Sequence, residues 1–210
     1  AGRLRAAVPD GDALPHFHLH LDKRVPYGAG LGSGSSDAAA TLRALVLFWG
    51  LETGAPELME IAAGIGSDVP FFLGAPLARG TGRGENLTEI DAVLPGTFVI
   101  AVPDQHVSTA EAYRMVVPDD APRPDLVEVV CSADFGRWAS ELRNDFEAPV
   151  AARWPAVAEA LDTMRSTGAR FAAMSGSGSA VFGVYGGTES ARQAASSLRD
   201  RGCTVWYGCP

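Results

Sequence analysis

The chain has 210 residues, of which 47% are hydrophobic and 20% are charged, an ordinary composition for one large or two small globular domains. Its formal net charge of −8 argues against the sequence-independent nucleic-acid binders, which need a basic face to displace phosphate counterions. No stretch approaches the roughly 18 consecutive apolar residues of a membrane-spanning helix, so neither nucleic acid nor a membrane is expected as a partner.

The number and spacing of the cysteines indicate whether the protein is found in a reducing or an oxidising compartment. Cys131, Cys203 and Cys209 form no Cys-x-x-Cys pair and are odd in number, which is typical of a reducing environment. We therefore expect a bacterial cytoplasmic protein, with a plastid protein as the alternative. The sequence opens with Ala-Gly and shows neither an apolar signal core nor a transit segment, and we expect it to begin partway into a longer protein.

The first predicted elements are a strand and a helix. Residues 16–22 alternate in polarity, which is typical of a half-buried strand, with Phe17, Leu19 and Leu21 on one face and His16, His18, His20 and Asp22 on the other. Residues 37–49 carry apolar side chains at helical spacing, and Ser35 or Ser36 is the expected N-cap. Three histidines on one face could hold zinc, but zinc ligands usually converge, so we predict a solvated polar face and no metal.

Later elements mix the two kinds of secondary structure. Patterns of hydrophobicity predict helices over 56–63, 134–142, 156–164 and 189–201, and strands over 97–102, 169–174, 180–185 and 204–207. The pattern changes at Leu94-Pro95-Gly96, which predicts domains over 1–95 and 96–210, and residues 118–124 form a proline-rich connector. Because few strand–helix–strand units are evident, the predicted fold class is α+β.

A dense glycine and serine loop, PYGAGLGSGSS, lies between the first strand and the first helix. Glycine lets the main chain approach a phosphate closely, and the unpaired amides of a helix N-terminus point at it. The helix dipole adds about 0.3–1 kcal/mol per negative charge. A flexible turn is the alternative, but glycine at every second position exceeds what a turn requires. We predict that the whole loop binds ATP phosphates, through Pro26, Tyr27, Gly28, Ala29, Gly30, Leu31, Gly32, Ser33, Gly34, Ser35 and Ser36.

Three common phosphate-binding loops do not fit this segment. The Walker A loop needs a lysine before its last residue, and no lysine follows Lys23. The Rossmann loop needs a third glycine where Ser33 or Ser35 stands. The protein-kinase loop fails on the same spacing, and neither His-Arg-Asp nor Asp-Phe-Gly follows.

Residues 26–39, PYGAGLGSGSSDAA, resemble the second motif of the GHMP kinases. Four further stretches resemble that family in the same order, namely residues 66–72 (GSDVPFF), 82–85 (GRGE), 144–147 (NDFE) and 174–178 (MSGSG). The members that act on 4-diphosphocytidyl-2-C-methyl-D-erythritol are the most similar, because they share the longer loop. The resemblance runs from about residue 18 to residue 185.

The resemblance implies an ATP-binding N-terminal domain like ribosomal protein S5, incomplete here, and a ferredoxin-like C-terminal domain. It implies ATP-dependent phosphorylation of the substrate's 2-hydroxyl in non-mevalonate isoprenoid synthesis, with Mg²⁺ on the ATP phosphates. The alternatives are a kinase for homoserine, mevalonate or phosphomevalonate, and an inactive nucleotide-binding fragment. The fragment is an alternative because the family's N-terminal lysine and its cytosine-holding residues have no counterpart in this sequence.

The resemblance also suggests residue roles. Asp68 is the expected catalytic base, with capping of a short helix before Pro70 as the alternative. Tyr113 corresponds to an aromatic that stacks on cytosine, or else is a half-buried helical tyrosine. Ser177 and its flanking glycines bind phosphate or form an ordinary turn. Lys23 does not match the family's lysine, and we expect it to be a solvated charge at a strand end. The Ser36 hydroxyl is not assigned to Mg²⁺, since helix capping explains it equally well.

Overall fold

The computed structural model describes residues 1–118 and 121–210, so residues 119–120 of the predicted connector lie outside the described residues. The chain divides into two compact units. Unit 1 comprises Ala1–Val25 and Gly32–Asp91, and unit 2 comprises Pro26–Leu31 and Ala92–Pro210. The first half of the glycine loop is therefore part of unit 2, whereas the second half is part of unit 1. No helix in the described ranges is long and apolar enough to cross a membrane.

Unit 1 is mainly helical. Its elements are α1 (Gly2–Ala7), the 3-10 helix η1 (Gly11–Ala13), α2 (Ser33–Trp49), α3 (Ala55–Ile65), the 3-10 helix η2 (Pro70–Leu73) and the antiparallel hairpin of β1 (Ala78–Thr81) and β2 (Asn86–Glu89). The helical stripe predicted for α2 supplies much of the core, which is formed by Leu4, Ala39, Leu42, Leu45, Ala62 and Val69. The predicted helix with Pro56 in its first turn is confirmed as α3.

Helix α2 begins earlier than its sequence pattern indicates. Its N-cap is Gly32, with φ 62° and ψ 19°, so the predicted caps Ser35 and Ser36 are wrong. The left-handed conformation of Gly32 turns the chain directly into the helix, so the serines adopt helical geometry in its first turns. The first intrahelical hydrogen bond runs from the Ser36 amide to the Gly32 carbonyl (2.9 Å).

The predicted strand over residues 16–22 is wrong. The segment is extended but unpaired, because no strand in the described part of the chain lies beside it to complete a hydrogen-bond ladder. On the predicted apolar face, Phe17 packs edge-on against Trp49, with 5.5 Å between ring centroids. Leu19 and Leu21 are both exposed. Alternation in polarity is therefore not enough to predict a paired strand, because it does not show whether a neighbouring strand is present.

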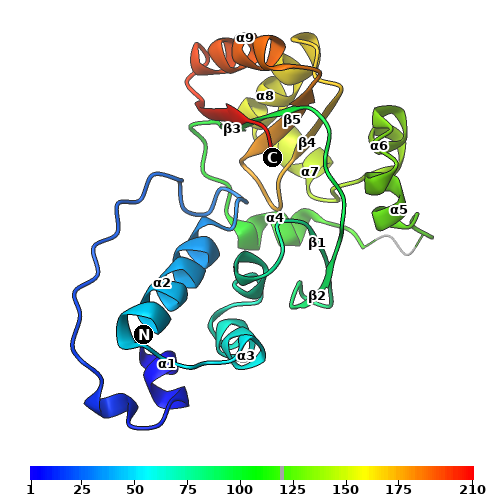
Figure 1. Cartoon of the computed structure of the whole chain (residues 1–210). Coiled ribbons are helices and arrows are strands. Elements are labelled where there is room, and N and C mark those ends of the chain that lie inside the picture. The colour runs from blue at the N-terminus through cyan, green and yellow to red at the C-terminus, as the bar shows by residue number, and fades with distance from the viewer. Residues whose placement is uncertain (119–120) are drawn as a thin grey trace. The chain divides into compact units, whose positions relative to one another are not determined.

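Unit 2 is built on a four-stranded sheet in which all neighbours are antiparallel. The strands β3 (Thr97–Val102), β4 (Phe171–Met174), β5 (Val181–Tyr185) and β6 (Thr204–Gly208) lie in the order β4-β5-β3-β6. Helices α8 (Pro155–Ser166) and α9 (Thr188–Arg199) pack on one face, as Figure 1 shows. This split strand–helix–strand arrangement is the expected ferredoxin-like topology, and its predicted strands and helices are confirmed.

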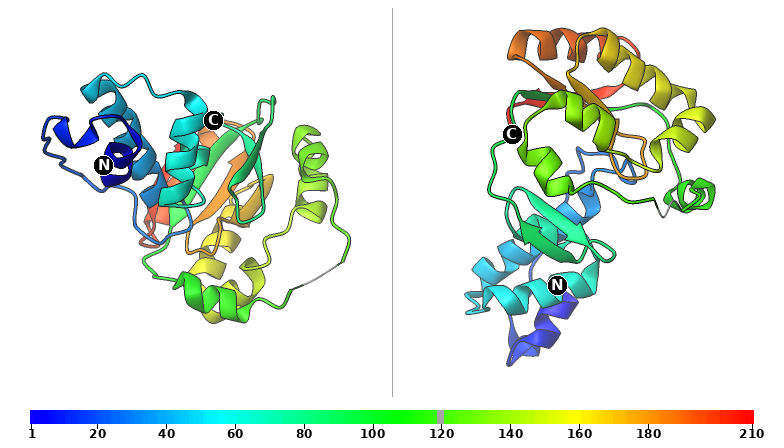
Figure 2. Two further views of the ribbon diagram at one scale, coloured as in Figure 1. Left: turned by 90° about the horizontal axis from the view of Figure 1, so that it is seen from below. Right: turned by 90° about the vertical axis from the view of Figure 1, so that its right-hand side faces the viewer.

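Shorter helices connect β3 to α8. They are α4 (Thr109–Met115), α5 (Leu126–Cys131), α6 (Phe135–Glu141) and α7 (Glu147–Arg153). Helices α5 and α6 cover the other face of the sheet, where Val129 and Trp138 pack with Phe171 and Val184, and both helices can be followed in Figure 2. The Trp138 indole donates to the Val129 carbonyl (2.8 Å). The sheet is thus buried on both faces.

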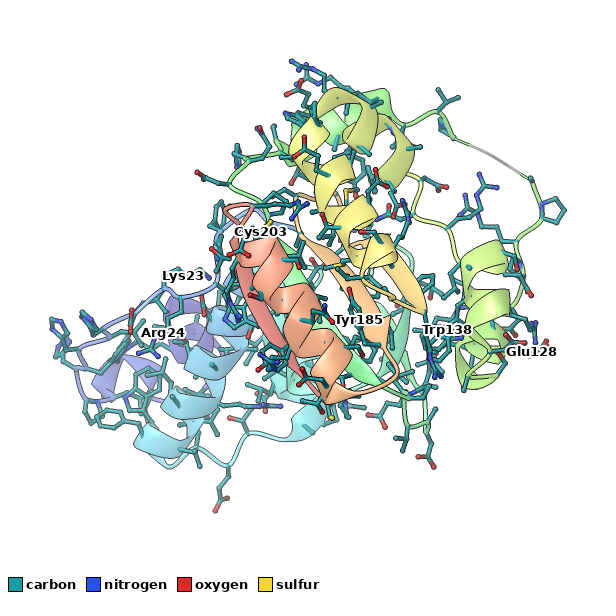
Figure 3. All side chains as sticks on the ribbon, turned by 90° about the horizontal axis from the view of Figure 1, so that it is seen from above. Lys23, Arg24, Glu128, Trp138, Tyr185 and Cys203 are labelled. Carbon is teal, nitrogen blue, oxygen red and sulfur yellow. The ribbon has the colours of Figure 1, made fainter. Side chains whose placement is uncertain are left out.

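Tyr185 in β5 is fully buried against α8 (Figure 3). A substitution at this residue tests how much its hydroxyl group contributes to the stability of unit 2. Its hydroxyl donates to the Met164 carbonyl (3.2 Å) and lies 3.0 Å from the Thr167 hydroxyl. We expect Tyr185→Phe to lower the free energy of unfolding in urea by about 1 kcal/mol, because a buried hydrogen-bonded group is lost. The matched control Tyr207→Phe, in the partly exposed ring of β6, should change it little. Equal losses in the two variants would contradict this account.

Candidate active site

Several main-chain amides of the glycine loop donate no hydrogen bond to another group of the described residues. Among the hydrogen bonds of the described residues, none is donated by the amides of residues 28–31. The amides of Gly34 and Ser35 precede the first intrahelical bond of α2, and no side chain caps this helix. Unpaired amides at a helix start are the groups that bind anions.

The main-chain conformation of the loop suits the same purpose. Gly28, Gly30 and Gly32 have φ values of 72°, 81° and 62°, in the left-handed region, whereas Ala29 and Leu31 between them do not have positive φ. Alternation of the two hands forms a concave nest of amides, which is a common anion-binding geometry. The repeated glycines are therefore a conformational requirement of the loop.

Within unit 2, the loop is fixed to the turn between β4 and β5. The Ser175 hydroxyl donates to the Gly30 carbonyl (2.9 Å), and the Ala180 amide donates to the Ala29 carbonyl (2.9 Å). A Cβ atom on Gly30 would lie 2.1 Å from the Ser175 carbonyl oxygen, so no other residue fits there. In the same turn, the Ser177 hydroxyl lies 3.3 Å from that of Thr109.

A cavity of about 270 Å³ adjoins the start of the loop within unit 2. Its walls are residues 26–29 of the loop, residues 102–106 after β3, and Ser179, Gly202 and Thr204. The His106 imidazole approaches to within 3.4 Å of the position of a Cβ atom on Gly28. Sequence reasoning found no role for His106, because no motif or periodicity links it to a loop about eighty residues earlier.

Asp68 lies in the exposed turn between α3 and η2. The N-cap of η2 is Val69 and no side chain caps it, so the capping alternative for Asp68 is wrong. Its carboxylate accepts a long hydrogen bond from Ser67 (3.4 Å) and has no cationic partner in the part of the chain that the structure describes. Buried Val69 and the Phe72 ring, which contacts Gly32, anchor this turn beside the start of α2.

The hairpin turn of residues 82–85 flanks Asp68 within unit 1. Gly84 lies against the Asp68 carboxylate, where a Cβ atom would approach to 3.4 Å. The amides of Glu85 itself and of Arg83 hold the pKa of the Glu85 carboxyl below its usual range. The Arg83 amide donates at 2.7 Å. This glycine-rich turn therefore brings main chain, without bulky side chains, close to Asp68.

Lys23 is not the solvated charge predicted from sequence. Its ammonium pairs with the Asp37 carboxylate in α2, and both side chains are about one-third exposed. The prediction failed because residues 16–22 form no strand, so Lys23 instead turns back onto the helix. The neighbouring Arg24 pairs with Asp22 (2.9 Å).

Tyr113 and the histidine row have different environments. Tyr113 lies on α4 and is 65% exposed, rather than half-buried, with its ring edge-on to Phe146 at 4.8 Å between centroids. Much of the ring is thus open to a stacking partner. His16, His18 and His20 lie in the extended segment, and the described residues contain no group of three side chains that could hold a metal ion.

Comparison with known proteins agrees with this geometry. The chain matches the family model of the GHMP kinases N terminal domain over residues 2–75 and that of the GHMP kinases C terminal over residues 126–202. A 4-diphosphocytidyl-2-C-methyl-D-erythritol kinase of Salinibacter ruber is 50% identical over 209 residues, which cover 96% of this chain and 72% of the relative. The enzyme of that name from Prosthecochloris aestuarii is 44% identical over 185 residues, covering 86% of this chain and 65% of the relative, so this chain spans less than two thirds of it.

Solved structures show the same relationship. The crystal structure of a 4-(cytidine 5'-diphospho)-2C-methyl-D-erythritol kinase superposes with a TM-score of 0.77 at 39% identity, covering 89% of this chain and 68% of that one. Homoserine kinase from Cytophaga hutchinsonii has a TM-score of 0.71 at 18% identity, covering 89% and 67%, and shares the fold.

The close approach at Gly30 yields the first prediction for the loop. We expect Gly30→Ala to weaken binding of a fluorescent ATP analogue at least tenfold, because left-handed strain of about 1–2 kcal/mol adds to the clash with Ser175. Gly187→Ala is the control, since it has extended geometry and open space around it. Retained affinity in folded Gly30→Ala would show that the loop does not depend on this contact.

The Lys23–Asp37 pair yields a second prediction. Lys23→Met leaves a carboxylate uncompensated near the start of α2, and we expect it to weaken binding of the ATP analogue about two- to fivefold, the range of a partly exposed ion pair. The double variant Lys23→Met/Asp37→Asn should regain most of that loss, because no net charge then remains. If the double variant binds as weakly as Lys23→Met, the lysine contributes by some means other than neutralising Asp37.

Proposed function

Because this chain belongs to the GHMP kinases, we propose that it transfers the γ-phosphoryl group of ATP to the 2-hydroxyl of 4-diphosphocytidyl-2-C-methyl-D-erythritol, in non-mevalonate isoprenoid synthesis. The name shared by its relatives supports this substrate. Homoserine, mevalonate and phosphomevalonate are the alternative substrates, but the kinases of those names that superpose are too distant in sequence to indicate more than the fold. The proposed ATP-binding domain is 1–95 and the proposed C-terminal domain 96–210.

The observation that carries the proposal is that the amides of residues 28–31, Gly34 and Ser35 donate no hydrogen bond among the described residues. Residues 26–36 hold the ATP polyphosphate in this proposal, through the nest formed around Gly28 and Gly30 and the uncapped start of α2. We propose that Mg²⁺ accompanies ATP there and takes most of its ligands from phosphate and water. Bound there, Mg²⁺ would neutralise part of the phosphate charge.

Asp68 is the proposed general base. Its carboxylate is exposed and unpaired within the described residues, so it is available to accept the proton of the substrate hydroxyl. Phosphoryl transfer depends mainly on positioning and charge stabilisation, and a positioned base adds about 10²–10⁴-fold in rate. The glycines of the hairpin beside Asp68 leave room for a substrate there.

Two residues of unit 2 are also proposed to bind substrate. Tyr113 offers an exposed aromatic ring, which can stack on cytosine with about 1–3 kcal/mol. Ser177 lies in the β4–β5 turn that also holds Gly30, so its hydroxyl and neighbouring amides are proposed to contact substrate phosphates.

A panel of alcohols tests the substrate. ADP release from ATP should appear with 4-diphosphocytidyl-2-C-methyl-D-erythritol and remain at background with homoserine, mevalonate and phosphomevalonate. Activity on one of those three instead would replace the proposed substrate. Nucleotide binding without turnover on any alcohol would favour the alternative of an inactive nucleotide-binding fragment.

Asp68→Asn tests the base. The amide keeps the shape of the side chain but accepts no proton, so we expect turnover to fall about 10²–10⁴-fold while the ATP dissociation constant stays unchanged. Asp91→Asn, also exposed and in the same unit, is the control and should keep full turnover. Parallel loss of ATP affinity in Asp68→Asn would indicate a structural role in place of catalysis.

A further inference from the structure

Residues 144–147, Asn-Asp-Phe-Glu, form a motif that the proposed chemistry leaves without a role. We infer that Asn144 and Glu147 are positioning residues, which hold the β4–β5 turn in the shape that carries the ATP loop. The inference rests on the proposed function only where it concerns ATP. The contacts themselves lie within unit 2.

Asn144 spans the turn with one side chain. Its amide nitrogen donates to the carbonyls of Met174 and Gly176, each at 2.8 Å. Its own oxygen accepts from the Phe146 amide (3.0 Å), which fixes the orientation of the amide group. Two protons on one nitrogen thus satisfy two carbonyls two residues apart, while the oxygen of the same side chain accepts a third hydrogen bond, a combination that a side-chain amide supplies.

Glu147 also holds this turn, through the main-chain amide of Met174. One carboxylate oxygen accepts from the Met174 amide (2.7 Å), and the other lies 3.3 Å from the Arg165 guanidinium. Hydrogen bonds to a charged group are the stronger kind, worth about twice a neutral one. The motif therefore fixes three main-chain groups at the entrance of the turn, the amide and carbonyl of Met174 and the carbonyl of Gly176.

The β4–β5 turn contacts residues 29–30 of the glycine loop, so the hydrogen bonds of Asn144 and Glu147 also restrict the position of that loop. Between the two held carbonyls stands Ser175, whose hydroxyl binds the Gly30 carbonyl (2.9 Å). The Gly30 carbonyl also lies 3.1 Å from the position of a Cβ atom on Gly176. Beyond the turn, the Ala180 amide binds the Ala29 carbonyl. A shift of the turn would therefore displace the main chain of Ala29 and Gly30.

The motif itself supplies a matched control. Asp145 lies between the two positioning residues but pairs with Arg123 (2.7 Å) and makes none of the turn contacts. Asp145→Asn therefore changes the charge of the motif without touching the turn. In Asn144→Asp, by contrast, a carboxylate faces two carbonyl oxygens and can donate to neither.

Two measurements on the full chain test the inference. Hydrogen exchange needs no ligand, and we expect the Ala180 amide to exchange faster in Asn144→Ala and Asn144→Asp than in the wild type and in Asp145→Asn. For a fluorescent ATP analogue, we expect the two Asn144 variants to bind about tenfold more weakly, with Asp145→Asn unchanged. The variant Asn144→Ala/Ser175→Ala should bind no more weakly than Asn144→Ala, because both residues act through one contact chain.

The outcomes separate the inference from the proposed function. Unchanged exchange at Ala180 in folded Asn144→Ala would overturn the inference, whatever the variants bind. Faster exchange, together with an ATP analogue that fails to bind even the wild type, would uphold the positioning role and overturn the proposed nucleotide site. A lowered melting temperature with unchanged exchange and unchanged affinity would assign Asn144 to general stability and also overturn the inference.

Discussion

The hydrogen bond from the Ser175 hydroxyl to the Gly30 carbonyl is the constraint on which the candidate site depends. It brings together segments that are 145 residues apart in sequence, and it leaves no room for a side chain on Gly30. The carbonyls of Ala29 and Gly30 accept hydrogen bonds from this turn, whereas the amides of residues 28–31 donate none among the described residues. An anion is the natural partner for such amides.

This contact explains why stretches that are distant in sequence form one family pattern. The loop of residues 26–31, the motif of residues 144–147 and the turn of residues 174–178 are linked by consecutive hydrogen bonds within unit 2. The ferredoxin-like sheet places them, since β4 and β5 are adjacent and their connection projects the turn from the sheet end. Glycines at 30 and 176 permit the close approach. Residues 26–31 of the loop are thus held by contacts within unit 2.

Sequence patterns predicted unit 2 far better than the start of unit 1. The strands β3 to β6 carry runs of β-branched and apolar residues, and the strands that pair with them lie in the described chain. The hydrophobic pattern of the sequence therefore agrees with the observed strands. Residues 16–22 have the same period but no partner strand, and the strand prediction failed there. The start of α2 was misplaced because serine caps are the common case, whereas left-handed Gly32 starts this helix. The shorter helices α5 and α7 are only six and seven residues long, too brief for a clear helical period.

By itself, the sequence determined the α+β class, the kinase family and the loop that presents its amides, because glycine spacing and hydrophobic period are local properties of the chain. The tertiary structure alone decided which groups hold that loop. Asn144 bonds carbonyls that lie 30 and 32 residues further along the chain, and Ser175 bonds the Gly30 carbonyl across 145 residues. Lys23 pairs with Asp37 because the irregular segment before the loop returns to helix α2. Which side chains pair depends on distances in the folded chain, and these distances cannot be read from the spacing of residues in the sequence.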